Sequence, residues 1–185
     1  MDHYTDVATF YTDYIEQLSL SVDSIADSAG RIAEIATATL FEDNRLFCVG
    51  VDIDAAAAIS LIEQLRSGIY RERPVLPVIE LTSRTAETRE SGIQWCLQQL
   101  RALGHPGDTA IIFYSDSHSN DIDAFSTILA QRGVQAAWVG CPGPGLSLSF
   151  PGANLATRLA LSQASAMSIA YLIDTLAFGP VDSET

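Results

Sequence analysis

The chain has 185 residues, of which 48% are hydrophobic, and this suits one domain with a sizeable core rather than a disordered chain. Its formal net charge is -13, and all ten basic residues are arginine. Such a surface repels the phosphates of nucleic acids and of anionic membranes, so we expect neither as a direct partner. No apolar stretch reaches the roughly 18 residues needed to cross a bilayer, and no basic stretch followed by an apolar core opens the chain. We therefore expect a cytoplasmic protein.

The first 40 residues predict a long amphipathic helix. Apolar residues recur at spacings of three and four, which is typical of one helix face. They are Val7, Phe10, Tyr11, Tyr14, Ile15 and Leu18. Residues 28–30, Ser-Ala-Gly, are expected to break this helix before it resumes. An arm with three aromatic side chains needs a partner surface, either its own domain or another subunit, and we favour another subunit.

Past residue 40, predicted strands alternate with predicted helices. The strands are expected at residues 45–51, 75–81, 109–114, 133–139 and 146–150, and the helices at 53–69, 85–103, 120–131 and 155–176. Such alternation requires crossover connections, and therefore a parallel sheet covered on both faces. Pro77 falls in the second strand, which indicates an edge position or a strand start. The sequence thus predicts a single α/β domain behind a helical arm.

Two loops are candidate ligand-binding sites, because ligands of open parallel sheets bind beyond the carboxyl ends of the strands. One loop is residues 50–54 and the other is residues 114–119. Their candidate side chains are Asp52, Asp54, Ser115, Ser117, His118 and Ser119.

Each candidate has two interpretations. The three serines could bind a small oxyanion through hydroxyls and backbone amides, or they could cap the following helix. His118 could protonate and contact a phosphate, or be an exposed loop residue. Asp52 and Asp54 could bind a cation or an amine, or be acids that suit a helix N-terminus. Asp116, in the second loop, would repel a phosphate.

The three cysteines, Cys48, Cys96 and Cys141, are odd in number and widely separated. Reduced structural thiols are therefore the favoured interpretation over a disulfide or a metal site. Cys141 precedes a Pro-Gly-Pro-Gly turn and could be exposed, so its reactivity stays open.

Several blocks of sequence resemble the sugar isomerase (SIS) domain family, in particular its phosphoheptose isomerase group and the non-catalytic DiaA proteins that associate with the initiator DnaA. The blocks are residues 71–79, 100–108, 120–122 and 172–174, followed by Leu176 and Phe178. The resemblance implies a three-layer, flavodoxin-like, five-stranded parallel sheet. It also implies a homotetramer with central N-terminal helices, hence an oligomerisation arm at 1–40 and an SIS domain at 41–180.

The chain lacks the catalytic machinery of the isomerases that the resemblance implies, in which a glutamate and a histidine move protons and a metal is bound. The family's metal and acid/base positions fall on Ser60 and Gln64 of one helix and on Leu159 and Ser162 of the last helix. None of these side chains is a titratable group that could act as a metal-bound base. The two phosphate loops of the family carry carboxylates here. We therefore predict no catalytic residue, no metal and no cofactor.

Two hypotheses follow. The leading one is a non-catalytic, DiaA-like tetrameric scaffold that acts through protein contacts, with DnaA as the partner that the resemblance suggests. Its candidate partner-binding surfaces are the helix at 53–69 and the tail residues Leu176 and Phe178.

The second hypothesis is a protein that binds a carbohydrate derivative. It would be either a phosphosugar sensor or a sedoheptulose 7-phosphate isomerase with a rearranged site. It depends on the remaining hydroxyls and on His118, and it is opposed by Asp52, Asp54 and Asp116 at the same mouth. A neutral or cationic ligand would escape that objection.

Overall fold

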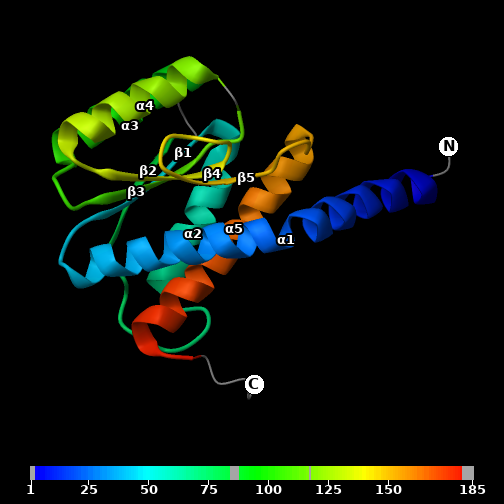
Figure 1. The fold of residues 1–185 in the computed structure, drawn as a ribbon, viewed down its shortest axis with the longest axis horizontal. Helices are drawn as coiled ribbons and strands as arrows, with labels where there is room; N and C mark the ends of the chain where they lie inside the picture. Colours follow the sequence, from blue (N-terminus) through cyan, green and yellow to red (C-terminus); the bar gives the residue numbers. More distant parts are fainter. Residues whose placement is uncertain (1–2, 84–87, 117, 181–185) are drawn as a thin grey trace.

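The computed structural model describes residues 3–83, 88–116 and 118–180. Its centre is a parallel sheet of five strands in the order β2-β1-β3-β4-β5 (Figure 1). The alternating pattern predicted a parallel sheet, and the resemblance implied five strands. The strands are β1 (Leu46–Val51), β2 (Val78–Ser83), β3 (Thr109–Phe113), β4 (Gln135–Gly140) and β5 (Leu146–Ser149). This order is the flavodoxin-like one, so the predicted fold class is confirmed.

Helices cover both faces of the sheet (Figure 1). They are α1 (His3–Phe41), α2 (Ala55–Ser67), α3 (Arg89–Leu103), α4 (Ser119–Arg132) and α5 (Leu155–Phe178), with a 3-10 turn, η1 (Asp52–Asp54), before α2. One hydrophobic cluster joins α1, α2 and α5 to the sheet, and a second joins α3 and α4 to the opposite face. The predicted start of the third helix, residues 85–87, lies outside the described residues.

Helix α1 runs without a break, so the predicted interruption at residues 28–30 is wrong. A mid-helix glycine costs about 1 kcal/mol, but packing overrides it here. Ala29, Ile32, Ala33 and Ala36 are all buried, and the three small alanines allow this part of α1 to pack closely on α5. The preceding part of α1 projects away from the domain as an arm (Figure 1).

Strand β2 begins at Val78, directly after Pro77, and lies at an edge of the sheet. The predicted strand started three residues too early, at Val75, because residues 72–77 form a loop.

Two ion pairs attach the segment before β2 to helix α5. The carboxylate of Asp174 on α5 is fully buried and accepts from Nε of Arg73 while Nε of Arg71 lies 2.9 Å away. These arginines therefore act within one chain.

The same two arginines satisfy the ends of two helices. Arg73 donates to the carbonyls of Gln64 and Leu65 at the end of α2, at 3.1 and 2.9 Å. Arg71 donates to the carbonyls of Phe178 and Gly179 at the end of α5, at 2.9 and 2.7 Å. The cluster has two arginines and one aspartate, and therefore one positive charge without a carboxylate. Positive charge near helix C-termini is favourable, so the dipoles of α2 and α5 stabilise it.

The expectation that no apolar segment is long enough to cross a bilayer is corrected by helix α5. With 24 residues, it is the one helix of the described chain that is long and apolar enough to cross a bilayer. A core position accounts for this composition, because α5 packs on α1 and α2 and buries Leu161, Ile169 and Ile173. It also carries the buried Asp174. We therefore assign α5 to the protein core.

Replacing Asp174 with asparagine should cost about 3–5 kcal/mol of unfolding free energy, because two guanidinium groups lose their buried counter-charge. Urea denaturation monitored by circular dichroism measures this cost. The matched control is Asp123→Asn, an exposed residue of α4, for which we expect a change within about 0.5 kcal/mol. Equal stability of the two variants would contradict a structural role for the cluster.

Candidate functional site

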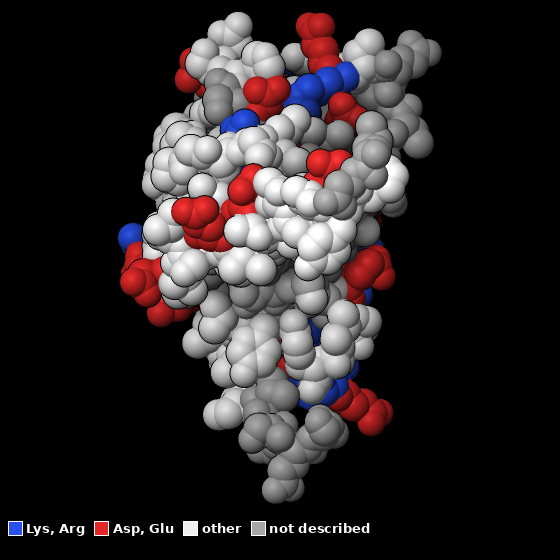
Figure 2. All heavy atoms as spheres, turned by 90° about the vertical axis from the view of Figure 1, so that its right-hand side faces the viewer, with Lys and Arg blue, Asp and Glu red and all other residues white. Residues whose placement is uncertain are grey.

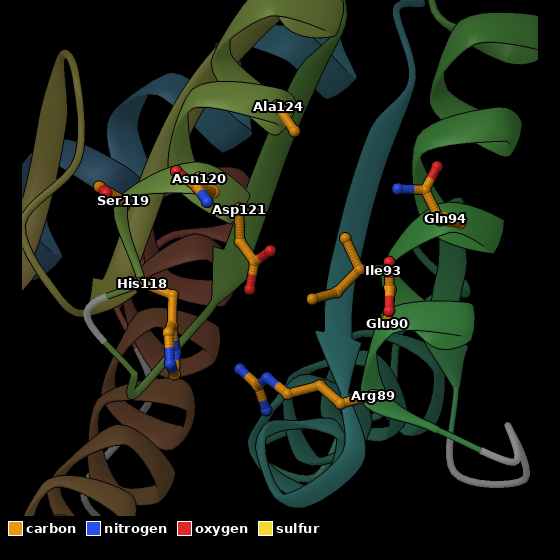
Figure 3. Close-up of a pocket in the computed structure, with 9 residues that line it drawn as sticks. All are labelled: Arg89, Glu90, Ile93, Gln94, His118, Ser119, Asn120, Asp121 and Ala124. Carbon is orange, nitrogen blue, oxygen red and sulfur yellow. The ribbon is translucent and has the colours of Figure 1, made fainter.

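A cleft of about 770 Å³ opens between the N-terminal ends of α3 and α4, at the carboxyl edge of the sheet (Figure 3). Its lining residues are Arg89, Glu90, Ile93, Gln94, His118, Ser119, Asn120, Asp121 and Ala124. The Arg89 side chain reaches from α3 toward His118, and Asp121 lies between the two helices (Figure 3). Of the two loops that the sequence singled out, only the second contributes to the lining, through His118 and Ser119, and no residue of the loop at 50–54 lines the cleft.

Asp54 lies behind this cleft and is almost completely buried, with 2% of its surface exposed. Its Oδ1 accepts a hydrogen bond of 3.0 Å from the backbone N–H of Ser115, and its Oδ2 lies 3.5 Å from Nη2 of Arg89. Burial raises the pKa of the Asp54 carboxyl, while the hydrogen bonds from Ser115 and the positive charge of Arg89 act in the opposite direction. The carboxylate thus has two partners from within the chain.

Asp52 does not share this environment. It is exposed, with a backbone φ of 58°, and it belongs to the short η1 turn. Both aspartates lie at the start of the α2 segment, where a negative charge suits the helix dipole, although neither makes a side-chain capping hydrogen bond. The two carboxylates also differ too much in burial to form a joint cation site.

Arg89 connects Asp54 to the cleft. Its guanidinium carbon lies 4.9 Å from the centre of the Tyr114 ring, and the Tyr114 hydroxyl donates a hydrogen bond of 2.5 Å to Asp121. Burial, and then the bond to Asp121, raise the pKa of Tyr114. A continuous series of contacts therefore runs from Asp54 through Arg89 and Tyr114 to Asp121 on α4.

Sequence reasoning missed Arg89, although a signal was present. Thr88 and Ser91 form a capping box, which marks Arg89 as the first residue of a helix. A cation at that position opposes the helix dipole, and such a mismatch indicates a specific partner. Here that partner is the carboxylate of Asp54.

The hydroxyl loop does not form the cluster that its sequence suggested. Ser115 is fully buried, whereas Ser119 is the first residue of α4 and is exposed at the cleft. His118 is also exposed, and its Nδ1 lies 2.8 Å from Oδ2 of Asp116. His118 is the N-cap residue of α4 but makes no side-chain capping bond. Ser117 lies outside the described residues.

The positions matched to isomerase catalysis lie in the packed layer of α2 and α5. Gln64 is buried, and its Nε2 donates to the backbone oxygen and the hydroxyl of Ser60, both at 3.2 Å. Its Oε1 accepts from the Tyr70 hydroxyl at 3.1 Å. Ser162 is buried, and Leu159 is partly buried. Within the described ranges, no group of three or more His, Cys, Asp or Glu side chains could hold a metal.

The two tail candidates differ in their surroundings. Leu176 is 48% exposed and Phe178 is 39% exposed. The guanidinium carbon of Arg73 lies 5.5 Å from the centre of the Phe178 ring, so Phe178 contributes to the arginine cluster at the end of α5. Leu176 is therefore the better probe of a binding surface.

All three cysteines are buried and unpaired, as a structural role requires. Burial raises the pKa of the Cys96 and Cys141 thiols to about 12 and that of Cys48 still further. The turn that follows Cys141 does not expose it, so the question of its reactivity is answered: this thiol is shielded.

No family model matches the chain, but individual proteins do. Phosphoheptose isomerase of Halorhodospira halophila is 28% identical over 139 residues, which cover 72% of the chain and 70% of that relative. The DnaA initiator-associating protein DiaA of Serratia proteamaculans is 28% identical over 117 residues, which cover 60% of each. The match to DiaA thus spans less than two thirds of that protein's length.

Solved structures share the whole architecture. The phosphoheptose isomerase of Francisella tularensis superposes with a TM-score of 0.82 over 95% of this chain and all of that one, at 16% identity. That of Neisseria gonorrhoeae gives a TM-score of 0.77 over 93% of this chain, also at 16% identity. The protein therefore has the SIS-domain fold. In sequence and in fold, the chain is similar to the SIS-domain group that contains the phosphoheptose isomerases and DiaA.

Proposed function

We propose that this protein is a non-catalytic, DiaA-like member of its group, a cytoplasmic scaffold that acts through protein contacts. The observation that carries the proposal is the environment of Gln64. This residue stands where the resemblance puts an isomerase acid/base group, and both ends of its amide are bonded to Ser60 and Tyr70. An amide cannot exchange the proton that aldose–ketose isomerisation must move. The protein is in this sense a pseudoenzyme.

The alternative is a phosphosugar-binding protein, or an isomerase with a rearranged site. The size of the cleft favours it, because about 770 Å³ suits a small ligand, and Arg89 and His118 supply donors. The charges oppose it, since Glu90 and Asp121 also line the cleft. At an effective dielectric constant of about 20, one carboxylate about 5 Å from a phosphate costs on the order of 3 kcal/mol.

Sugar phosphates, including sedoheptulose 7-phosphate, should not raise the melting temperature of the protein, with or without zinc, and should not be isomerised. A ligand that binds only the native state stabilises it by mass action, so differential scanning fluorimetry is a sensitive screen. A saturable shift combined with measurable turnover would overturn the proposed function. A saturable shift without turnover would support the phosphosugar sensor instead.

The arm of α1 supports an oligomer, which we propose to be a homotetramer assembled through residues 1–40, with residues 41–180 as the SIS domain. Large apolar side chains of the arm, among them Tyr11 and Ile15, are more than half exposed in the single chain. Figure 2 views the molecule from the side toward which the arm projects, and most of this surface carries no charged side chain, apart from scattered acidic and a few basic residues. Such an apolar surface requires a partner.

Ile15→Asp should weaken this assembly, because it places a carboxylate in the apolar stripe of the arm. We expect the concentration of half-dissociation to rise at least tenfold, as measured by light scattering across a dilution series. Thr9→Asp adds the same charge on the opposite side of the same helix and serves as the control. A monomeric wild-type protein would contradict the proposed assembly, as would equal effects of the two substitutions.

For the protein contact, DnaA is the partner that the name of the DiaA relatives suggests. The candidate surface lies where α2 and α5 end. There the exposed side chains of Ile69, Val75, Tyr171 and Leu176 surround the arginine cluster. Tyr70, just after α2, contacts Tyr171 of α5 edge to face, with 5.1 Å between the ring centres, and so links the two helices.

Leu176→Ser should weaken binding of purified DnaA at least tenfold while leaving the melting temperature and the oligomeric state unchanged. Biolayer interferometry with immobilised DnaA measures the affinity. Gln98→Ala, an exposed change on α3 in the opposite layer, is the control. Binding that is equally strong in both variants would remove the tail from the proposed surface, and no binding by the wild type would remove DnaA as the partner.

A further inference from the structure

The loop after β3 already binds an anion, and that anion belongs to the chain itself. The Ser115 N–H follows the carboxyl end of β3 and donates to Oδ1 of Asp54 at 3.0 Å. On its other side, Asp54 faces the guanidinium of Arg89, with Oδ2 3.5 Å from Nη2. A backbone amide and an arginine that converge on two carboxylate oxygens form an oxyanion-binding arrangement.

We propose that Asp54 is a built-in anion that fills this oxyanion position and thereby sets the charge selectivity of the adjoining cleft. Its carboxylate stands in for one edge of a phosphate group. The cleft in front of it accepts neutral or cationic polar ligands and rejects phosphates. The inference deepens the proposed loss of isomerase function, since it names the residue that keeps phosphate out of the site.

The position of Asp54 in the chain makes it a strong internal competitor. It is the residue directly before α2, so its backbone is fixed by the helix that follows. A side chain held in place acts at a high effective concentration, because its loss of freedom has already occurred on folding. A free phosphate would have to displace it from a site where it is 98% buried, as its exposed fraction of 2% implies.

The charge of the cleft reinforces this selectivity. Arg89 lines the cleft, and its charge is already matched by Asp54. A second anion would face Glu90 and Asp121 across the cleft without a free counter-charge from Arg89. Exchanging Asp54 for a neutral residue releases Arg89 for an external ligand. The gain depends on that release and not on the overall charge of the protein.

Inorganic phosphate is the probe, and the full-length protein is titrated by isothermal titration calorimetry. We expect Asp54→Asn and Asp54→Ser to bind phosphate at least tenfold more tightly than the wild type. Adding Arg89→Gln to either variant should abolish the gain. Asp52→Asn is the matched control, because it removes one charge from the same turn, at an exposed site, and leaves the internal anion in place.

Several outcomes would overturn the inference. They are a folded Asp54→Asn protein with no gain in phosphate binding, an equal gain in Asp52→Asn, and wild-type binding as tight as that of the variants. Asp54→Asn retains an acceptor for Ser115 N–H and almost the same shape, so the test does not depend on the more disruptive serine variant. Turnover of sugar phosphates by the wild type would refute the proposed function separately, since this comparison measures only phosphate binding.

Discussion

The buried carboxylate of Asp174 on α5 holds the loop before β2, which lies about a hundred residues earlier in the chain. It fixes Arg71 and Arg73 in the loop before β2, and so it positions an edge strand that has only one neighbour in the sheet. The same arginines bond the last carbonyls of α2 and α5, which makes the loop a common cap for both helices. Buried ion pairs are costly unless every partner is satisfied. Here the helix carbonyls balance the second positive charge.

The two buried aspartates show how one side-chain type serves two purposes. Asp174 is surrounded by arginines that have further partners, and it belongs to sequence blocks that the resemblance covers. Asp54 occupies a loop where this chain departs from the pattern of its group, and its partner Arg89 lines the cleft. The first arrangement lies where α2 and α5 end and supports the fold. The second arrangement borders a cleft, so its replacement changes what the cleft can bind.

Much of the fold followed from local patterns, because alternation of apolar strands with amphipathic helices depends on residues close in sequence. Pro77 also marked the edge strand correctly, since an edge tolerates a missing donor. The continuity of α1 past Gly30 was not predictable, because it depends on contacts with α5, at the other end of the chain. Arg89 was missed for the same reason. Its partner Asp54 precedes it by 35 residues, and the two side chains meet only because the sheet places the ends of their strands next to each other.

The candidate site was harder to predict than the fold, because a list of residue types does not specify burial. Ser115, His118 and Ser119 are close in sequence, yet the first is buried and the other two are exposed. The strand direction decides this, since a parallel strand ends with one amide directed to the interior and the chain then turns outward to the helix. A loop that carries carboxylates can keep this backbone path, because the Asp54 carboxylate satisfies the amide of Ser115 from within the chain. The backbone path of the fold therefore tolerates a carboxylate of the chain itself at this amide.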